Sequence, residues 1–121
     1  MYEFHGNKQR YFDMTHQVTV GHIIPFLQQQ WTFPSEMKVL EIGCGEAGVL
    51  KAFTDLGFHC TGIELEENRL EFAREFMKTE LENGVVQFLN KDIYDVIPEV
   101  DLGTRFDLII LKDVIEHIPD Q

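Results

Sequence analysis

The fold is decided by one stretch, residues 38–48, which reads Lys38-Val39-Leu40-Glu41-Ile42-Gly43-Cys44-Gly45-Glu46-Ala47-Gly48. An apolar run that carries one acid leads into three glycines with the spacing Gly-x-Gly-x-x-Gly. Apolar residues at helical spacing follow, so we predict a strand over 38–42, a tight turn, and a helix over 47–56. Glycines allow positive φ and let a ligand approach the backbone closely, and the helix start adds free N–H groups.

The same alternation of strand and helix continues toward the end of the sequence. Apolar runs predict strands over 59–63, 85–89 and 106–111, and an amphipathic pattern predicts a helix over 67–82. Such alternation is typical of an α/β fold with a parallel sheet and right-handed crossovers. We expect a Rossmann-like sheet with strand order 3-2-1-4 and helices on both faces, partial because the C-terminal strands are lacking.

The first third of the chain has a different pattern. Residues 16–30 predict a helix that Pro25 kinks or splits, and residues 1–14 predict an arm without clear periodicity. The aromatic residues of that arm either pack on the body or form a flap over a pocket. We therefore divide the chain into an N-terminal arm and helix, 1–34, and a partial Rossmann-like domain, 35–121.

Composition limits the classes of partner and compartment. The 121 residues carry a formal net charge of −11, which argues against a phosphate-backbone footprint on this segment. The two cysteines form neither a disulfide framework nor a zinc spacing, and we expect a reducing cytoplasm. No apolar run reaches the roughly 18 residues of a membrane span, so we expect no contact with a membrane.

Four motifs together resemble one family. The first is Val39-Leu40-Glu41-Ile42-Gly43-Cys44-Gly45, and the others are Gly62-Ile63-Glu64-Leu65, Asn90-Lys91-Asp92-Ile93 and the run from Phe106 to Ile118. In this order, at the strand ends, they resemble the motifs of class I S-adenosylmethionine (AdoMet)-dependent methyltransferases. The resemblance covers residues 38–118 and implies that AdoMet is the cofactor.

The resemblance also implies a set of cofactor-binding residues. The turn residues Gly43, Cys44 and Gly45 would pass close to the nucleoside and methionine parts. Glu41 would organise the turn and favour the cationic amino group, although it could instead pair with a local backbone donor. The methionine end and the methyl group would lie near two residues that follow the fourth strand, Lys112 and Asp113.

The adenosine half of the cofactor would lie at the ends of the second and third strands. Glu64, nineteen residues after Gly45, would accept hydrogen bonds from the ribose hydroxyls. Leu65 would cover the adenine, with Ile93 packed nearby. Asp92 would accept from the adenine amino group, or would simply cap the next helix.

A metal site is a weaker possibility. Asp113, Glu116 and His117 lie at i, i+3 and i+4 on one helix turn, a spacing that can bring ligands together. Further ligands are not evident, so we expect no metal and interpret the carboxylates as groups favoured at a helix start. No general base can be named, and the catalytic residues stay unassigned.

The predicted function is transfer of a methyl group from AdoMet to a small-molecule acceptor. One alternative is an NAD-dependent dehydrogenase, whose glycine fingerprint Gly43, Gly45 and Gly48 also satisfy and in which Glu64 would hold the ribose. Another is a truncated AdoMet-fold module with a binding or scaffold role. An apolar fourth strand at the sheet edge invites pairing, so we expect self-association or a further C-terminal half to cover it.

Overall fold

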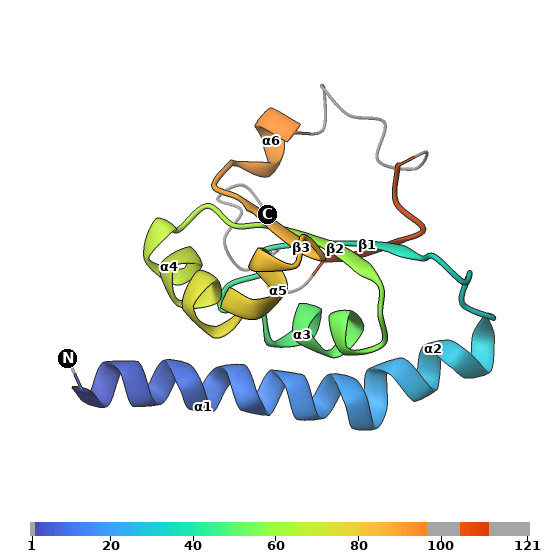
Figure 1. Ribbon diagram of the computed structural model, residues 1–121, viewed down its shortest axis with the longest axis horizontal. Coiled ribbons are helices and arrows are strands. Elements are labelled where there is room, and N and C mark those ends of the chain that lie inside the picture. Colours follow the sequence, from blue (N-terminus) through green and yellow to red (C-terminus); the bar gives the residue numbers. More distant parts are fainter. Residues whose placement is uncertain (1, 97–104, 112–121) are drawn as a thin grey trace, which may run out of the picture.

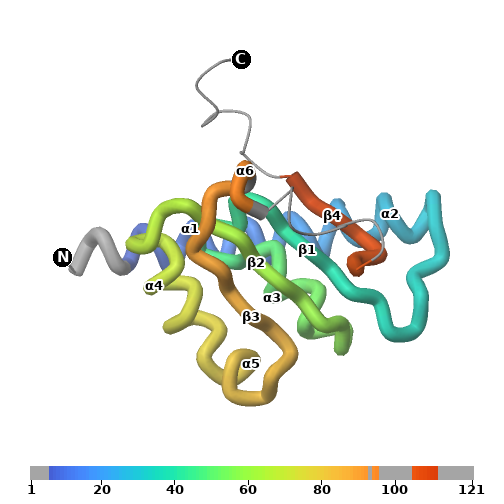
Figure 2. The backbone as a smooth tube through the Cα atoms, turned by 90° about the horizontal axis from the view of Figure 1, so that it is seen from above, coloured from blue at the N-terminus to red at the C-terminus, as the bar shows by residue number. Residues whose placement is uncertain are grey.

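The computed structural model describes residues 2–96 and 105–111, which form a four-stranded parallel sheet. The strands are β1 (Lys38–Ile42), β2 (His59–Ile63), β3 (Val86–Leu89) and β4 (Leu108–Leu111). They lie in the order β3-β2-β1-β4, which Figure 2 shows from above. The predicted α/β fold class and strand order are therefore confirmed.

Most of the helices gather on one side of this sheet (Figure 1). α3 (Gly48–Asp55), α4 (Glu67–Phe76) and α5 (Lys78–Glu82) lie directly beneath the strands, and the short α6 (Ile93–Val96) lies on the opposite side. The single helix predicted over 67–82 is two helices. They meet at the fully buried Met77, whose φ of −111° and ψ of 26° are not helical.

The segment predicted as an arm is the long helix α1 (Tyr2–Val18), which packs beneath α3 as an outer layer (Figure 1). Its buried residues include Phe12 and Thr15, and Thr19, just past the end of this helix, continues the same face at spacings of three and four. Two of these three side chains are polar, so the helical period is hidden from a search for apolar residues. The expectation of an arm was wrong for this reason.

The irregularity predicted near Pro25 takes the form of a π-helical turn within a continuous helical path. A single π-helical turn, η1 (Thr19–Ile23), joins α1 to α2 (Ile24–Gln30), and the N–H of Ile24 donates to the carbonyl of Thr19. Proline has no N–H and fits the first turn of a helix, where that donor has no partner within the helix. The helical path therefore runs on through residues 2–30, with a π-helical turn just before Pro25, which lies in the first turn of α2.

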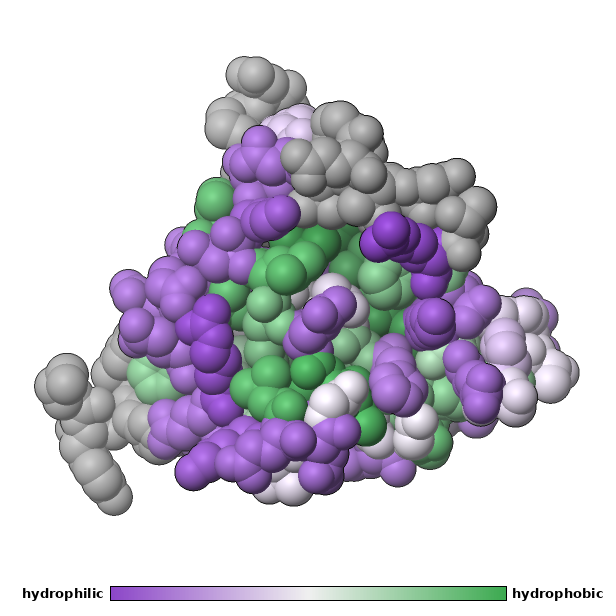
Figure 3. All heavy atoms as spheres, turned by 45° about the horizontal axis from the view of Figure 1, so that its top comes forward, coloured by the Kyte–Doolittle hydropathy of each residue, from purple (hydrophilic) through white to green (hydrophobic). Residues whose placement is uncertain are grey.

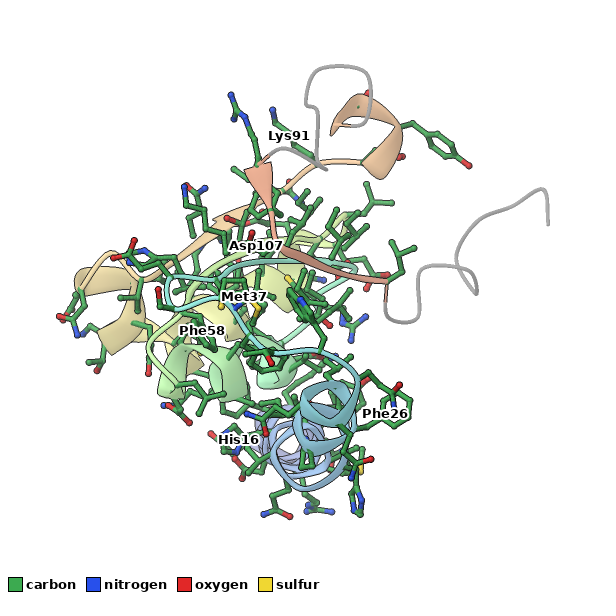
Figure 4. All side chains as sticks on the ribbon, turned by 90° about the vertical axis from the view of Figure 1, so that its right-hand side faces the viewer. His16, Phe26, Met37, Phe58, Lys91 and Asp107 are labelled. Carbon is green, nitrogen blue, oxygen red and sulfur yellow. The ribbon has the colours of Figure 1, made fainter. Side chains whose placement is uncertain are left out.

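The main hydrophobic core lies between the sheet and the helices. Figure 4 shows Met37 and Phe58 inside this layer, while Phe26 points outward from α2 and is 60 % exposed. At the amino end of the sheet, Asp107 ties β4 to β1, because its Oδ2 accepts from the Lys38 N–H at 2.9 Å. Asp107 thus has a structural role at the start of β4.

A second, smaller cluster occupies the other face of the sheet, built on Leu40, Ile42 and Ile63. Figure 3 looks partly onto this face and shows apolar surface bordered by polar side chains. On β4 this face stays exposed, with Ile109 at 37 % and Leu111 at 62 %. Among the described residues, only the helix side of β4 is covered.

Candidate functional site

The glycine turn after β1 is held tightly to the end of β2. The N–H groups of Gly43 and Cys44 both donate to the carbonyl of Ile63, at 2.8 and 3.1 Å. Gly43 and Gly45 have φ of 81° and 55°, a region that glycine enters without steric cost. Ala47 also has a positive φ, 76°, just before α3 begins, so the turn stores some backbone strain.

Glu64 lies beside this turn at the end of β2, with its side chain almost fully buried. Its Oε1 accepts from the N–H of Gly45 at 2.8 Å, and its Oε2 accepts from the N–H of Glu66 at 3.0 Å. A carboxylate oxygen has two lone pairs, so each oxygen keeps capacity for another donor. The carboxylate therefore fixes the turn and can still accept from a diol such as a ribose.

The ends of β2 and β3 are joined by a residue to which the sequence assigned no role. The side-chain amide of Asn90 donates to the carbonyls of Glu64 and Leu65, at 3.0 and 2.9 Å. Leu65 itself is 62 % exposed and directly follows Glu64 in the chain. The ends of the two strands thus form one continuous edge.

Asp92 follows β3 and takes the helix-capping role that the sequence left open as an alternative. Its Oδ1 accepts from the N–H of Tyr94 at 2.9 Å, at the start of α6. Ile93 is the first residue of that helix. The structure places both residues at the expected strand end, and their contact with an adenine stays a prediction.

Glu41 is fully buried in β1, on the same face of the sheet as Val39. Burial and then the charge of Glu41 raise the pKa of the Cys60 thiol to about 12. Burial, followed by Glu41 and Glu64, also raises the pKa of the Cys44 thiol well above its usual value. Both thiols are therefore protonated at neutral pH, and neither is a candidate nucleophile.

The structure adds a charged cluster that the sequence did not predict, centred on Glu46 within the glycine turn. The Glu46 side chain is only 1 % exposed. Arg69 of α4 holds both of its oxygens, with Nε at 3.2 and 3.1 Å, and Lys8 of α1 reaches Oε1 at 3.0 Å. Burial opposes ionisation of Glu46, but these hydrogen bonds outweigh it and lower its pKa.

The Arg69 guanidinium also lies directly against the glycine turn. A Cβ at Gly45 would lie 2.4 Å from Nη2 of Arg69. On its other sides the guanidinium has Glu64, with Nη1 4.0 Å from Oε1, and the ring of Tyr11, 5.9 Å from the centroid. The Arg69 guanidinium therefore occupies part of the space that a side chain at Gly45 would need.

Some predicted site residues lie outside the described ranges. These are Lys112, Asp113, Glu116 and His117. Across residues 2–96 and 105–111, no group of three or more His, Cys, Asp or Glu side chains is arranged to hold a metal ion. Within the same ranges, no helix combines the length and apolar character that crossing a membrane requires.

Comparison with known proteins decides the family. A family model described as "Methyltransferase domain" matches residues 34–121, which is most of the chain. The chain belongs to this family. The resemblance to class I AdoMet-dependent methyltransferases is thereby confirmed.

Curated relatives of this methyltransferase domain include proteins named ubiquinone biosynthesis O-methyltransferase. The one from Bordetella avium is 28 % identical over 98 % of this chain and 49 % of its own length. The one from Histophilus somni is 31 % identical over 90 % of this chain and 45 % of its own length. The chain thus spans about half the length of the curated relatives it matches.

Solved structures of low identity share the fold. A putative S-adenosyl-L-methionine-dependent methyltransferase from Methanococcus maripaludis superposes with a TM-score of 0.73, at 17 % identity, over 98 % of this chain and 51 % of that one. Magnesium protoporphyrin IX methyltransferase from Synechocystis, solved with bound SAM, gives a TM-score of 0.65 at 24 % identity, over 88 % of this chain and 48 % of that one.

Proposed function

We propose that this methyltransferase domain binds AdoMet at the carboxyl edge of its sheet and serves an enzyme that methylates a small molecule. The observation that carries the proposal is the Gly45–Glu64 hydrogen bond of 2.8 Å, which sets a carboxylate beside a glycine turn. In open parallel sheets ligands bind at this edge, where neighbouring connections leave the sheet in different directions. The residues present therefore fit a nucleoside cofactor.

We assign the binding roles as follows. Glu64 accepts from the ribose hydroxyls with the lone pairs that Gly45 and Glu66 leave free, and Leu65 covers the adenine. Gly43, Cys44 and Gly45 line the path of the nucleoside and methionine parts. The remaining expected contacts are Asp92 and Ile93 at the adenine, and Glu41, Lys112 and Asp113 toward the methionine end.

Charge favours AdoMet over a dinucleotide. Buried Glu41 lies ahead of the glycine turn, whereas a pyrophosphate would bring two negative charges to that place. When bound, AdoMet supplies a methyl group on a cationic sulfonium, ready for in-line displacement. The protein then contributes mainly position, alignment and exclusion of water. Membership of the methyltransferase family also argues against the dehydrogenase alternative.

The acceptor that we propose is a small molecule that accepts the methyl group on oxygen. Support comes from the curated relatives named ubiquinone biosynthesis O-methyltransferase. The net charge of −11 speaks against nucleic acid as a partner of this segment. Two free, buried cysteines suit the reducing cytoplasm that we propose as its location.

We further propose that the β4 edge is covered in the active protein. Ile109 and Leu111 expose apolar side chains on the outermost strand, and an unpaired apolar edge is a template for another strand. A second copy of the chain or additional strands of a longer protein would both cover it. Sedimentation of the 121-residue chain separates these cases, because only self-association gives a dimer.

Calorimetric titration with S-adenosylhomocysteine tests the cofactor, with NADH as the comparison ligand and Glu64→Ala as the control variant. We expect the wild-type chain to bind S-adenosylhomocysteine and not NADH, and Glu64→Ala to lose that binding. Binding of NADH alone would overturn the proposal. Binding of neither ligand would show that the described edge is not sufficient as a cofactor site.

A further inference from the structure

We propose that Glu46 is a positioning residue that couples helix α1 to the cofactor carboxylate Glu64 through Arg69. This inference rests on the proposed cofactor site. It adds to that site three side chains, Lys8, Glu46 and Arg69, that are not among the expected cofactor contacts.

A glutamate that is 1 % exposed within a ligand-binding turn needs compensation, because an ionised carboxylate is costly to bury unless it is paired. Glu46 has that compensation from two directions. Arg69 holds Oε1 and Oε2 from α4, and Lys8 holds Oε1 from α1 at 3.0 Å. The turn is therefore clamped between two helices that come from distant parts of the sequence.

These contacts close a ring that includes the proposed ribose carboxylate. Glu46 pairs with Arg69, whose Nη1 lies 4.0 Å from Oε1 of Glu64. The same Glu64 oxygen accepts from the N–H of Gly45, the residue before Glu46. Any shift of Glu46 therefore moves both the guanidinium and the turn against which Glu64 is aligned.

Lys8 and Tyr11 extend this ring to α1. Tyr11 lies under the Arg69 guanidinium, with 5.9 Å from Cζ to the ring centroid, and Lys8 lies one turn earlier on the same helix. If the ring transmits force, ligand binding at Glu64 must tighten the contact of α1, and loosening that contact must weaken the ligand, since coupling is reciprocal.

A matched contact elsewhere provides the control. His16 Nε2 of α1 lies 3.0 Å from Oδ2 of Asp55 at the end of α3, so this pair also ties α1 to α3. Among the described contacts, the side chains of this pair do not reach the glycine turn. Asp55→Asn therefore removes the charge from an attachment of α1 without touching the ring, whereas Glu46→Gln removes the charge from the ring with a side chain of the same shape.

The test compares S-adenosylhomocysteine affinity by calorimetry with hydrogen–deuterium exchange of the α1 amides, residues 6–15. We expect Glu46→Gln to lower the affinity about tenfold, within the usual range of coupling between sites. We also expect ligand-induced protection of α1 in the wild type and in Asp55→Asn, but not in Glu46→Gln. A merely structural role for Glu46 would reduce stability and leave these two readouts unchanged.

A second pair of variants guards against misfolding of Glu46→Gln. Lys8 and Lys51 are lysines of similar exposure, 23 and 28 %, and each makes an ion pair, but only Lys8 reaches the turn. We expect Lys8→Met to weaken S-adenosylhomocysteine about fivefold and Lys51→Met to leave it unchanged. Equal affinity of Lys8→Met and Lys51→Met would overturn the inference. Absence of binding to the wild type would instead overturn the proposed function, and this inference with it.

Discussion

The N–H of Gly45 lies 2.8 Å from Oε1 of Glu64, and this bond joins two motifs that are nineteen residues apart. It gives the carboxylate two tasks, because the oxygen that would face a ribose hydroxyl also holds the turn in place. The Glu64 carboxylate therefore both fixes the shape of the turn and provides the proposed hydrogen-bond acceptor for the ribose. Changing that group must affect both the affinity for a nucleoside and the stability of the fold.

Glu64→Gln tests this double role. The amide keeps one acceptor oxygen but replaces the other with a donor, which then faces an N–H group of the turn or of Glu66. We expect S-adenosylhomocysteine to bind roughly 10- to 100-fold more weakly, from the loss of one or two hydrogen bonds to a charged group. We also expect the free energy of unfolding to fall by about 1–2 kcal/mol. Calorimetry and urea unfolding measure the two effects.

Glu66→Gln is the matched control, because Glu66 is the exposed neighbour whose N–H, not its side chain, contacts Glu64. We expect this variant to bind S-adenosylhomocysteine like the wild type and to unfold within about 0.5 kcal/mol of it. Equal losses in the two variants would mean that general acidity near the turn, rather than the Glu64 carboxylate, is what the ligand needs.

The strands were predictable because their signals are local. β1 and β2 have the predicted bounds, 38–42 and 59–63, since each apolar run ends at a glycine or an acid that breaks the pattern. The alternation with helices then fixes the parallel order. The position of Glu64 beside Gly45 follows from that order alone, because parallel neighbours end at the same edge of the sheet.

Neither α1 nor the Glu46 cluster has such a local signal. Glu46 pairs with residues 38 and 23 positions away in sequence, and charges on exposed and buried faces look alike in a sequence. The buried face that α1 shares with η1 includes Thr15 and Thr19, whose polarity hides the period. Tertiary packing against α3, rather than apolar periodicity, defines this helix.

Gly48→Ala tests that packing. A Cβ at Gly48 would lie 1.9 Å from Oγ1 of Thr15 and 2.4 Å from the carbonyl of Phe12, so α1 has to move away from α3. We expect a loss of about 2–3 kcal/mol in the free energy of unfolding, which is the usual cost of overpacking. Urea unfolding followed by circular dichroism measures it.

Gly21→Ala provides the comparison for this variant. Gly21 lies in η1, and a Cβ there would meet nothing within 4 Å. We expect Gly21→Ala to be neutral or to stabilise by up to about 1 kcal/mol, because alanine lowers the entropy of the unfolded chain. If Gly48→Ala were as neutral as Gly21→Ala, a glycine at position 48 would not be needed for the contact between α1 and α3.

Acid should remove the contribution of Glu46 to stability. Burial opposes its ionisation, but hydrogen bonds from Arg69 and Lys8 prevail and hold the pKa below the ordinary 4.5. A depressed carboxyl pKa adds stability above the unfolded pKa, and this stability is lost as the pH falls through the folded pKa. At pH 7 we expect Glu46→Gln to be about 3 kcal/mol less stable than the wild type.

The difference in unfolding free energy between the wild type and Glu46→Gln should shrink as the pH is lowered from 4.5 toward 3. Protonated Glu46 and glutamine are both uncharged in that range. Urea midpoints at a series of pH values measure it. Glu82→Gln, at an exposed acid of α5, should follow the wild type within about 0.5 kcal/mol at every pH. A difference for Glu46→Gln that stayed constant down to pH 3 would contradict a charged pair.

Alkylation of the two thiols reports on opening of the glycine turn. Burial, together with nearby carboxylates, raises the pKa of Cys44 well above its usual value and that of Cys60 to about 12, so little thiolate exists at pH 8. We expect iodoacetamide to label both thiols at least roughly 100-fold more slowly in the folded protein than in urea, as read by mass spectrometry. S-adenosylhomocysteine should slow the labelling of Cys44 more than that of Cys60, because only Cys44 lies in the turn. Rapid labelling of Cys44 in the folded, unliganded chain would show that the turn opens freely, despite its bonds to Ile63 and Glu64.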